Sequence, residues 1–367
     1  MNDSKSIFII TSEFPPQPGG IGNHAYHLAN ELHVQGFKIT VLTDERSKKG
    51  LEEKEFDANQ PFDILRIKRY NIVFYTYLKR ISTYRRLVSS QQLVLASGKF
   101  SLWLVGLDPF LKSKNKYAVI HGSELNLQGV SKKLIDRALQ NFRTIIAVSH
   151  YTKSLVSSLN LKNIQVIPNG FKMAVIENLA PTKNLKNKNY PVLITVGNVS
   201  ERKGQLNMIK ALPELLKVYP TSLYHIVGIP TLQKTFEKEA KKLGVHKSVI
   251  FHGKVTEERK QYLLKESDIF VMLSSLTSTG DVEGFGIAII EANVLGLPAI
   301  GSNNSGIVDA IKNNVSGKLV DPLNTMEIIE AIEDISTTYL NYSNQAKEWS
   351  QQFDWKIIIK KYLKIFE

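Results

Sequence analysis

The 367-residue chain contains no cysteine, and this absence excludes several kinds of chemistry. Without thiols there is no disulfide, no thiolate nucleophile and no zinc–thiolate site, so histidine and carboxylates would have to hold any metal. Long apolar runs are also missing, because no stretch approaches the roughly 18 to 20 residues that cross a bilayer. The start MNDSKSIFII lacks the pattern of a signal peptide. We therefore expect a cytoplasmic protein.

Acidic residues are absent from residues 64–107, although the chain as a whole carries a net charge of +13. Within that stretch, residues 70–88 place apolar side chains at helical spacing with cations beside them. This pattern predicts an interfacial helix that binds an anionic membrane surface through residues 66–86. The alternative is a helix packed on its own domain with a solvated basic rim. Nucleic acid is not expected, because no recognition motif accompanies the charge. The cations of the stretch are Arg66, Lys68, Arg69, Lys79, Arg80, Arg85, Arg86 and Lys99.

Chain length and strand pattern predict two domains of α/β class. A chain of this length exceeds the roughly 250 to 300 residues that one core supports. Short buried runs alternate with helix-length segments up to residue 170, as a parallel sheet requires. A polar stretch over residues 171–190 is then expected to be the linker, after which the pattern restarts. We predict two doubly wound domains that face each other across a central cleft.

The segment EGFGIAIIEANVLGLP, residues 283–298, predicts a helix from Gly286 to Gly296. Gly284 and Gly286 allow backbone amides to approach a phosphate at the helix N-terminus. Because eight helical residues rise about 12 Å, Glu283 and Glu291 are expected to grip the two ends of an elongated ligand with a diphosphate in its middle. The alternative is one glutamate favoured by the helix dipole and one that is partly exposed.

Three further motifs carry candidate residues. SERKG places Arg202 and Lys203 at a strand-to-helix turn, where they are expected to neutralise the same diphosphate. PPQPGGIGNH offers a glycine loop with Gly20 and Gly22, whose spacing differs from the dinucleotide fingerprint and so disfavours a nicotinamide cofactor. VIHGSE places His121 at the carboxyl end of a predicted strand.

No metal or other cofactor is expected. His24 and His27 are spaced as a helical pair, but no nearby carboxylate completes a metal site. Asp281 and Glu283 imitate an acidic metal motif, yet the glycines that follow favour a sugar contact for Glu283.

Taken together, the motifs resemble the retaining glycosyltransferases of family 4, which have the GT-B fold. The resemblance runs from about residue 7 to the end, and the ordered set is more specific than any single motif. It implies two Rossmann-like domains, an acceptor-binding one at 1–171 and a donor-binding one at 172–350, with residues 351–367 packing back on the first. The motifs that carry it are PPQPGGIG, HGSE, IPNG, SERKG, EGFGIAIIEA, GLPAIGSNNSGI, SGKLVDP and FDWKIIIKKYLKIFE.

The resemblance also implies residue roles. Glu283 would bind donor-sugar hydroxyls and Glu291 the ribose, while His121 would contact the sugar near the reacting carbon. One departure is Asn198, because many family members have arginine there, and Arg202 would then supply that charge. The catalytic candidates are His121, Arg202, Lys203 and Glu283. The donor-binding candidates are Gly20, Gly22, Asn198, Arg202, Lys203, Glu283, Gly284, Phe285, Gly286 and Glu291.

The implied activity is metal-independent transfer of a hexose-type sugar from a UDP- or GDP-type nucleotide sugar, with retention of anomeric configuration. The acceptor would be a hydroxyl of a glycan or lipid-linked molecule in cell-surface polysaccharide or glycolipid biosynthesis. The enzyme would be cytoplasmic, at the inner face of the membrane. Two alternatives stay open: a nucleotide-sugar epimerase of similar fold, and an inactive nucleotide-sugar-binding partner of another transferase.

Overall fold

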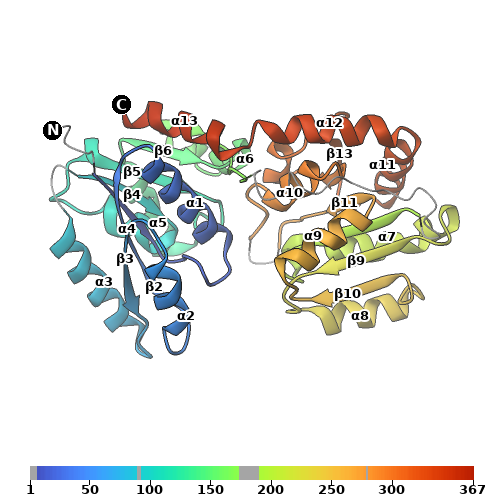
Figure 1. Cartoon of the computed structure of the whole chain (residues 1–367), viewed down its shortest axis with the longest axis horizontal. Helices are drawn as coiled ribbons and strands as arrows, with labels where there is room; N and C mark the ends of the chain where they lie inside the picture. The colour runs from blue at the N-terminus through green and yellow to red at the C-terminus, as the bar shows by residue number, and fades with distance from the viewer. Residues whose placement is uncertain (1–5, 89–91, 173–189, 278–279) are drawn as a thin grey trace. The chain divides into compact units, whose positions relative to one another are not determined.

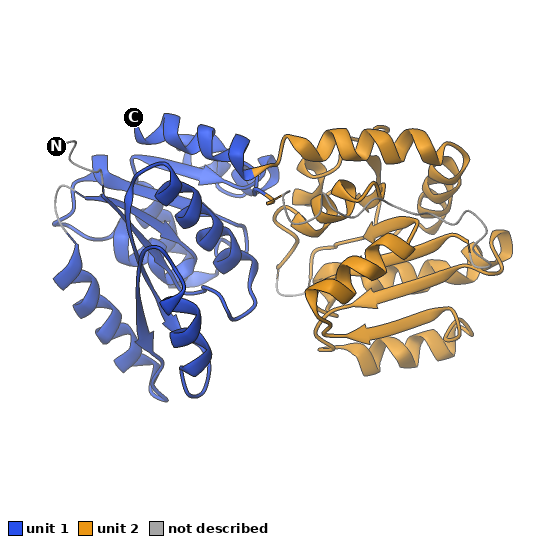
Figure 2. Ribbon diagram, in the orientation of Figure 1, with its two compact units in different colours: residues 1–170, 355–367 blue, residues 171–354 orange. Residues whose placement is uncertain are grey.

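The computed structural model describes residues 6–88, 92–172, 190–277 and 280–367 and divides the chain into two compact units (Figures 1 and 2). Unit 1 comprises residues 1–170 and 355–367, and unit 2 comprises residues 171–354. The predicted boundaries lay at 171/172 and 350/351, so the return to unit 1 occurs four residues later than expected. Most of the predicted linker, residues 173–189, lies outside the described residues.

Unit 1 contains a seven-stranded parallel sheet in the order β3-β2-β1-β4-β5-β6-β7. Its strands are β1 (Ser6–Thr11), β2 (Lys38–Glu45), β3 (Asp63–Lys68), β4 (Leu93–Ser97), β5 (Lys116–Ile120), β6 (Thr144–Ala147) and β7 (Ile164–Val166). Its helices are α1 (Gly20–Val34), α2 (Leu51–Ala58), α3 (Val73–Leu87), α4 (Lys99–Gly106), α5 (Gly129–Leu139), α6 (His150–Ser154) and α13 (Trp355–Phe366), with short 3-10 turns at Ser113–Asn115 and Ser157–Leu159.

Unit 2 contains a six-stranded parallel sheet in the order β10-β9-β8-β11-β12-β13. Its strands are β8 (Val192–Val196), β9 (Leu223–Val227), β10 (Val249–Gly253), β11 (Ile269–Met272), β12 (Ala299–Ser302) and β13 (Gly317–Val320). Its helices are α7 (Gln205–Val218), α8 (Gln233–Lys242), α9 (Glu257–Glu266), α10 (Ile287–Val294), α11 (Thr325–Thr337) and α12 (Tyr339–Gln351), with 3-10 turns at Glu201–Lys203 and Gly306–Asp309.

The central strands are buried on both faces, which explains their continuous apolar sequence. In β1, the consecutive residues Ile7, Phe8, Ile9 and Ile10 are each at most 3% exposed. Alternate side chains of a strand point to opposite faces, so helices must cover both sides of this sheet. The predicted pair of doubly wound, Rossmann-like folds is confirmed.

Helix α13 belongs to unit 1, where it packs on α1. Trp355 at its start is 1% exposed and lies against Gly170, where an added Cβ would meet the indole ring at 2.5 Å. At its other end Phe366 packs edge-on against Tyr117 of β5, with ring centroids 5.0 Å apart. The last helix of the chain therefore completes the core of the first unit.

Candidate functional site

The two central strands of the unit 2 sheet, β8 and β11, lie side by side, and the strand order runs in opposite directions on either side of them. In open parallel sheets, ligands bind beyond the carboxyl ends of the strands at this switch point. The loops that follow β8 and β11 carry Arg202, Lys203 and Glu283. The sequence candidates thus lie where the topology of the sheet favours a ligand.

The turn after β8 needs glycine at two positions. Gly204 has a φ of +70°, and an added Cβ would lie 1.8 Å from the carbonyl oxygen of Leu273 at the end of β11. At Gly197, a Cβ would lie 3.0 Å from Cε of Lys203, because the aliphatic stem of that lysine crosses the strand end there. These close approaches fix the direction in which Lys203 leaves the turn.

Lys203 and Arg202 both bind the carboxylate of Glu283. The Lys203 Nζ to Glu283 Oε2 distance is 2.6 Å, and the Arg202 Nη1 to Glu283 Oε2 distance is 2.5 Å. Arg202 Nε also lies 3.3 Å from Asp281 Oδ2. The side chains of Lys203 and Glu283 are each only 13% exposed, so this is a largely buried ion cluster. We call Arg202, Lys203 and Glu283 the charge cluster.

The charge cluster keeps Glu283 ionised. Burial by itself would raise the pKa of this carboxyl, but the neighbouring Lys203 and then Arg202 outweigh it and lower the pKa to about 2. A carboxylate with so low a pKa is a poor general base at neutral pH. It is instead suited to orient two cations and to accept hydrogen bonds from hydroxyl groups.

The backbone around Glu283 is held from two sides. Its amide donates to Ser274 Oγ at 3.1 Å, and its carbonyl accepts from the amide of Gly306 at 2.9 Å. An added Cβ at Gly306 would lie 2.0 Å from the Gly284 carbonyl oxygen, so the two loops touch through their backbones. Phe285, 1% exposed, packs against Phe353. The segment from Glu283 to Gly286 is therefore tightly positioned.

The helix predicted over 286–296 is present but shorter than expected, and a left-handed turn separates it from Glu283. Helix α10 runs from Ile287 to Val294, with Gly286 as its N-cap at a φ of +91°. The expectation that helical rise sets the distance between Glu283 and Glu291 is therefore wrong, because the left-handed turn at Gly286 intervenes. Glu291 has a different partner: its Oε2 lies 2.8 Å from Nζ of Lys260 on α9.

Asn198 lies in the same turn as the charge cluster. Asn198 is exposed, and its backbone carbonyl accepts a hydrogen bond from Gln205 Nε2 at 3.0 Å. Arg202 is three residues from this turn's helix, α7, and already reaches Glu283. The structure therefore places a positive charge in the turn even though asparagine occupies position 198.

His121 lies in unit 1, at the carboxyl end of β5. Its Nε2 is 3.0 Å from Ser97 Oγ at the end of β4, and its ring centroid is 5.1 Å from that of His24. The buried Glu124 carboxylate accepts from the His121 amide at 2.5 Å. Burial lowers the pKa of His121 to about 4, so the imidazole is neutral at pH 7. A neutral imidazole can donate to or accept from a hydroxyl group.

The sequence predicts that Gly20 and Gly22 lie in a loop, but this expectation is wrong. Both residues fall in the first turn of α1, whose N-cap is Gly19. An added Cβ at Gly22 would lie 2.7 Å from the Glu13 carbonyl carbon, so close packing of the helix on the chain after β1 explains this glycine. Gly20 has nothing within 4 Å of its Cβ position, and its expected contact with phosphate stays a prediction.

The histidine pair of α1 has partners other than a metal. His24 is 4% exposed, and its Nε2 lies 3.0 Å from the Tyr362 hydroxyl of α13. Its ring also contacts Trp355, as does that of His27. These contacts join α1 to α13, which is a structural role.

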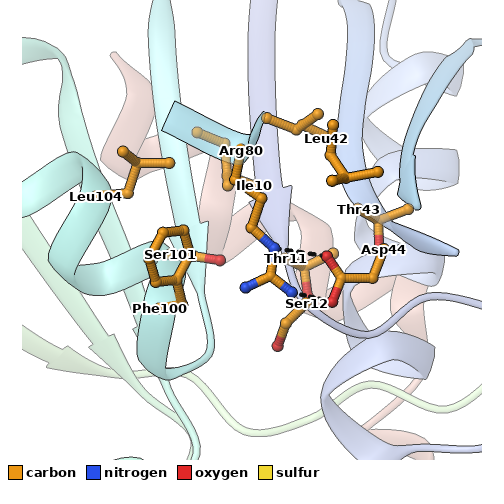
Figure 3. A pocket seen from close by; sticks show the side chains of 11 residues that line it. Ile10, Thr11, Ser12, Leu42, Thr43, Asp44, Arg80, Phe100, Ser101 and Leu104 are labelled. Carbon is orange, nitrogen blue, oxygen red and sulfur yellow. Dashed lines mark hydrogen bonds and ion pairs between the residues drawn. The ribbon is translucent and has the colours of Figure 1, made fainter. Parts of the chain in front are cut away.

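Helix α3 occupies most of the predicted segment 70–88, but only its Thr76, Thr83 and Tyr84 are buried. Arg80 reaches from α3 into a cavity at the carboxyl ends of β1 and β2, where it pairs with Asp44 (Figure 3). Its guanidinium also lies 4.9 Å from the centre of the Phe100 ring. Arg80 therefore anchors the helix to the sheet and is not available as a surface charge. Other cations of the stretch pair likewise: Arg66 with Asp57, Arg69 with Asp44 and Arg85 with Asp108.

Three contacts of the candidate residues could not be predicted from local sequence. Lys260 is 31 residues from its partner Glu291, Ser97 is 24 residues from His121, and Ser274 is nine residues from Glu283. Lysine and serine are common in surface loops, so residue type alone gave no signal.

Within the described ranges, no helix has the length and apolar character needed to cross a bilayer.

Comparisons with known proteins match both parts of the chain to glycosyltransferases. Residues 177–352 match the family described as Glycosyl transferases group 1, and residues 18–174 match the one described as Glycosyltransferase Family 4. A mannosyltransferase of Mycolicibacterium smegmatis, described as GDP-mannose-dependent and acting on phosphatidylinositol monomannoside, is 25% identical over 90% of this chain and 88% of its own. The gpi3 subunit of a phosphatidylinositol N-acetylglucosaminyltransferase from Schizosaccharomyces pombe is 21% identical over 98% of this chain and 80% of its own.

Solved structures show the same fold. The crystal structure of the Anabaena protein HepE in complex with UDP and glucose has a TM-score of 0.78 to this chain, with 18% identity and 99% of each chain covered.

Proposed function

The chain belongs to the GT-B glycosyltransferases of family 4, group 1, and from this premise we propose that it moves a hexose-type sugar from a nucleotide-diphosphate donor to a hydroxyl of a glycan or lipid-linked acceptor. The observation that carries the proposal is the charge cluster. Two cations, Arg202 and Lys203, converge at the sheet switch point of unit 2, beside the N-terminus of α10. Cations and helix amides together suit a diphosphate.

Glu283 has two roles in the proposed donor site. It holds Arg202 and Lys203 in place before the donor arrives, so little reorganisation is needed when the diphosphate binds. It also accepts hydrogen bonds from hydroxyl groups of the donor sugar. The segment of Gly284, Phe285 and Gly286 is proposed to contact the sugar and phosphate through its backbone, with the Gly286 amide also bonded to the Glu283 carboxylate. Glu291 is proposed to accept the ribose hydroxyls.

The proposed reaction retains the anomeric configuration. The bond between the anomeric carbon and the diphosphate oxygen breaks, and the acceptor oxygen forms its bond on the same face of the sugar. The acceptor proton passes to the leaving diphosphate. Arg202 and Lys203 stabilise the negative charge that develops on that leaving group, which is why we expect no metal requirement. His121, neutral at pH 7, contacts the sugar near the reacting carbon.

The donor is proposed to be of UDP or GDP type. Two observations support this: a relative over 90% of the chain is described as GDP-mannose-dependent, and a protein of the same fold binds UDP and glucose. Thermal melting of the protein with a panel of UDP-, GDP- and ADP-sugars tests the donor class, because a specific ligand stabilises the folded state by mass action. We expect one nucleotide class to raise Tm in the wild type but not in Lys203→Ala.

Donor incubated without acceptor provides the companion experiment. A transferase leaves the sugar of the intact donor unchanged, whereas an epimerase changes its stereochemistry without any acceptor. Chromatography of the donor after incubation distinguishes the two. A new nucleotide sugar in the absence of acceptor would overturn the proposal of sugar transfer.

We further propose that α3 docks on an anionic membrane surface at the cytoplasmic face. Eight large apolar or aromatic side chains in and just before α3 are at least 37% exposed. They are Tyr70, Ile72, Val73, Phe74, Tyr75, Tyr77, Leu78 and Ile81. Tyr70, Tyr75 and Leu78 also line a surface hollow together with Lys79. Packing on the chain's own domain, the alternative raised by the sequence, leaves this surface uncovered.

Charge complementarity supports anionic lipid as the proposed partner of this surface. Lys68, Lys79 and Arg86 are exposed around the apolar side chains, while the acidic partners Asp44, Asp57 and Asp108 are occupied by other cations of the stretch. Apolar side chains flanked by basic ones suit an interface with anionic lipid, where each basic residue contributes about 1 kcal/mol. A lipid-linked acceptor would be presented at that surface.

Flotation with vesicles tests the membrane proposal. We expect the wild type to float with vesicles containing anionic phosphatidylglycerol but not with pure phosphatidylcholine, and binding to weaken as salt is raised. Lys79→Glu/Arg86→Glu should abolish flotation, and Phe74→Ser/Leu78→Ser should reduce it. Lys217→Glu/Lys242→Glu, an equal charge change at exposed sites of unit 2, is the matched control and should leave it unchanged. Equal flotation of all variants would overturn the proposal.

A further inference from the structure

Lys260 on α9 joins two carboxylates from different helices. Its Nζ lies 2.8 Å from Glu291 Oε2 and 2.8 Å from Glu257 Oε1. The side chains of Lys260 and Glu291 are 19% and 17% exposed, whereas that of Glu257 is 59% exposed. The contact with Glu291 is therefore the sheltered one of the two.

This contact holds the ammonium group charged. Burial alone would lower the pKa of Lys260, but Glu291 and Glu257 outweigh it and raise the pKa above its ordinary value. A charged hydrogen bond of this kind is shorter and stronger than a neutral one. At neutral pH the Glu291 carboxylate thus has a positively charged partner at one oxygen.

The geometry matters because Lys260, among the residues that the structure describes, contacts one oxygen of Glu291 and not the other. The terminal torsion of a glutamate side chain is broad and about two-fold, so an unanchored carboxylate rotates freely. The Lys260 contact is to Oε2, which fixes the plane of the group and leaves Oε1 to accept hydroxyl groups. Recognition of two neighbouring hydroxyls by one carboxylate depends on such a fixed orientation.

We infer that Lys260 is a positioning residue that orients Glu291 and so lets the donor site distinguish a nucleotide with intact ribose hydroxyls from one that lacks them. The inference rests on the proposed function, in which Glu291 accepts the ribose hydroxyls. Lys260 acts through Glu291 and need not touch the donor. Its role is a contribution to selectivity, separate from the charge that Arg202 and Lys203 provide for the diphosphate.

The test compares affinities for a nucleoside diphosphate and for its 2′,3′-dideoxy analogue, measured by isothermal titration calorimetry. UDP and GDP are both titrated into the wild type, and the tighter one is used with its analogue. Hydrogen bonds to a charged group are each worth enough to change affinity about tenfold, so we expect the wild type to prefer the ribonucleotide by roughly that factor or more. Glu291→Gln should lose most of the preference.

Lys260→Met should reduce the preference to about twofold while the affinity for the dideoxy analogue stays the same. Lys260→Arg, which keeps the charge, should retain it. Lys242→Met, which removes a lysine from an exposed helical pair on α8, is the matched control and should leave both affinities unchanged. Thermal melting of each variant confirms that it is folded.

Three results would overturn the inference, and they differ in what else they overturn. If the wild type and Glu291→Gln show no preference, Glu291 is not the ribose contact and the proposed donor site is wrong as well. If the wild type shows the preference and Lys260→Met keeps it, only the positioning role is wrong. If Lys260→Met weakens both ligands equally, Lys260 supports the fold and not selectivity.

Discussion

The charge cluster makes a prediction about stability that can be worked out from its geometry. Glu283→Gln keeps the size of the side chain but removes the charge that binds Lys203 and Arg202. The pKa of Glu283 lies near 2, against 4.5 for an unperturbed carboxyl. Since one pKa unit corresponds to about 1.4 kcal/mol, ionised Glu283 contributes about 3 kcal/mol to the stability of unit 2 at pH 7. Removing one member of a buried ion pair costs a similar amount, about 3 to 5 kcal/mol.

The pH dependence has a definite sign. A carboxyl whose pKa is lowered by folding stabilises the native state above its unfolded pKa of 4.5, and this stability is lost as the pH falls through about 2. The difference between wild type and Glu283→Gln should therefore shrink from about 3 kcal/mol at pH 7 to less than half of that at pH 3. Peptide-resolved hydrogen exchange across a urea series measures the free energy of unfolding of β8 and β11. Strands β1 and β5 of unit 1 serve as the internal control.

The double variant Lys203→Met/Glu283→Gln separates the ion pair from the loss of either group alone. Residues in one ion-pair network usually show coupling energies of about 0.5 to 3 kcal/mol. We expect the double variant to lose clearly less stability than the sum of the two single variants. Additive losses, or a difference between wild type and Glu283→Gln that does not change between pH 7 and pH 3, would refute the reasoning.

Further predictions concern other parts of the molecule. Gly204→Ala should destabilise unit 2 by more than about 3 kcal/mol, because the added Cβ would clash with the Leu273 carbonyl. Gly244→Ala is the control: its φ is +74° but the space around it is open, so it should cost only about 1 to 2 kcal/mol. Thermal melting compares the two variants. His121 stays neutral down to about pH 4 in the folded state but protonates near pH 6.5 in the unfolded state, so the stability of unit 1 should fall as the pH drops from 6.5 to 4. Hydrogen exchange should show a smaller fall in stability for His121→Gln than for the wild type. Sugar transfer should continue in the presence of EDTA, and its loss, restored by a divalent cation, would contradict the proposed role of Arg202 and Lys203 as the charges on the leaving group.

The fold could be predicted from the sequence because burial leaves a strong mark on it. Strands covered on both faces are continuously apolar, as in SIFII of β1, and helices alternate with them. The exact bounds of a helix that begins at a glycine turn were harder to predict, because they depend on the backbone conformation of that glycine. The left-handed turn at Gly286 separates Glu283 from α10, so helical rise does not set the distance between Glu283 and Glu291.

Local sequence makes Arg202, Lys203 and Glu283 candidates for a donor site, and that assignment stays a prediction. Their pairing has no local signal, because Glu283 lies 81 residues from Arg202 and 80 residues from Lys203 along the chain. Conversely, the cations of residues 66–86 were expected to flank an apolar stripe on an interfacial helix, yet Arg80 pairs with Asp44, which lies 36 residues earlier in the chain. Such ion pairs join residues that are far apart in the sequence, so a local sequence pattern cannot predict them.

The central claim is that the chain transfers sugar from a nucleotide donor bound at the charge cluster. The most direct measurement incubates the purified protein with the donor identified by thermal melting and with lipid-linked acceptors, and follows the product by mass spectrometry and NMR. We predict a glycosylated acceptor whose new linkage has the anomeric configuration of the donor, with transfer abolished in Lys203→Ala and Glu283→Ala. Normal transfer by both variants, or a product of inverted configuration, would contradict the account.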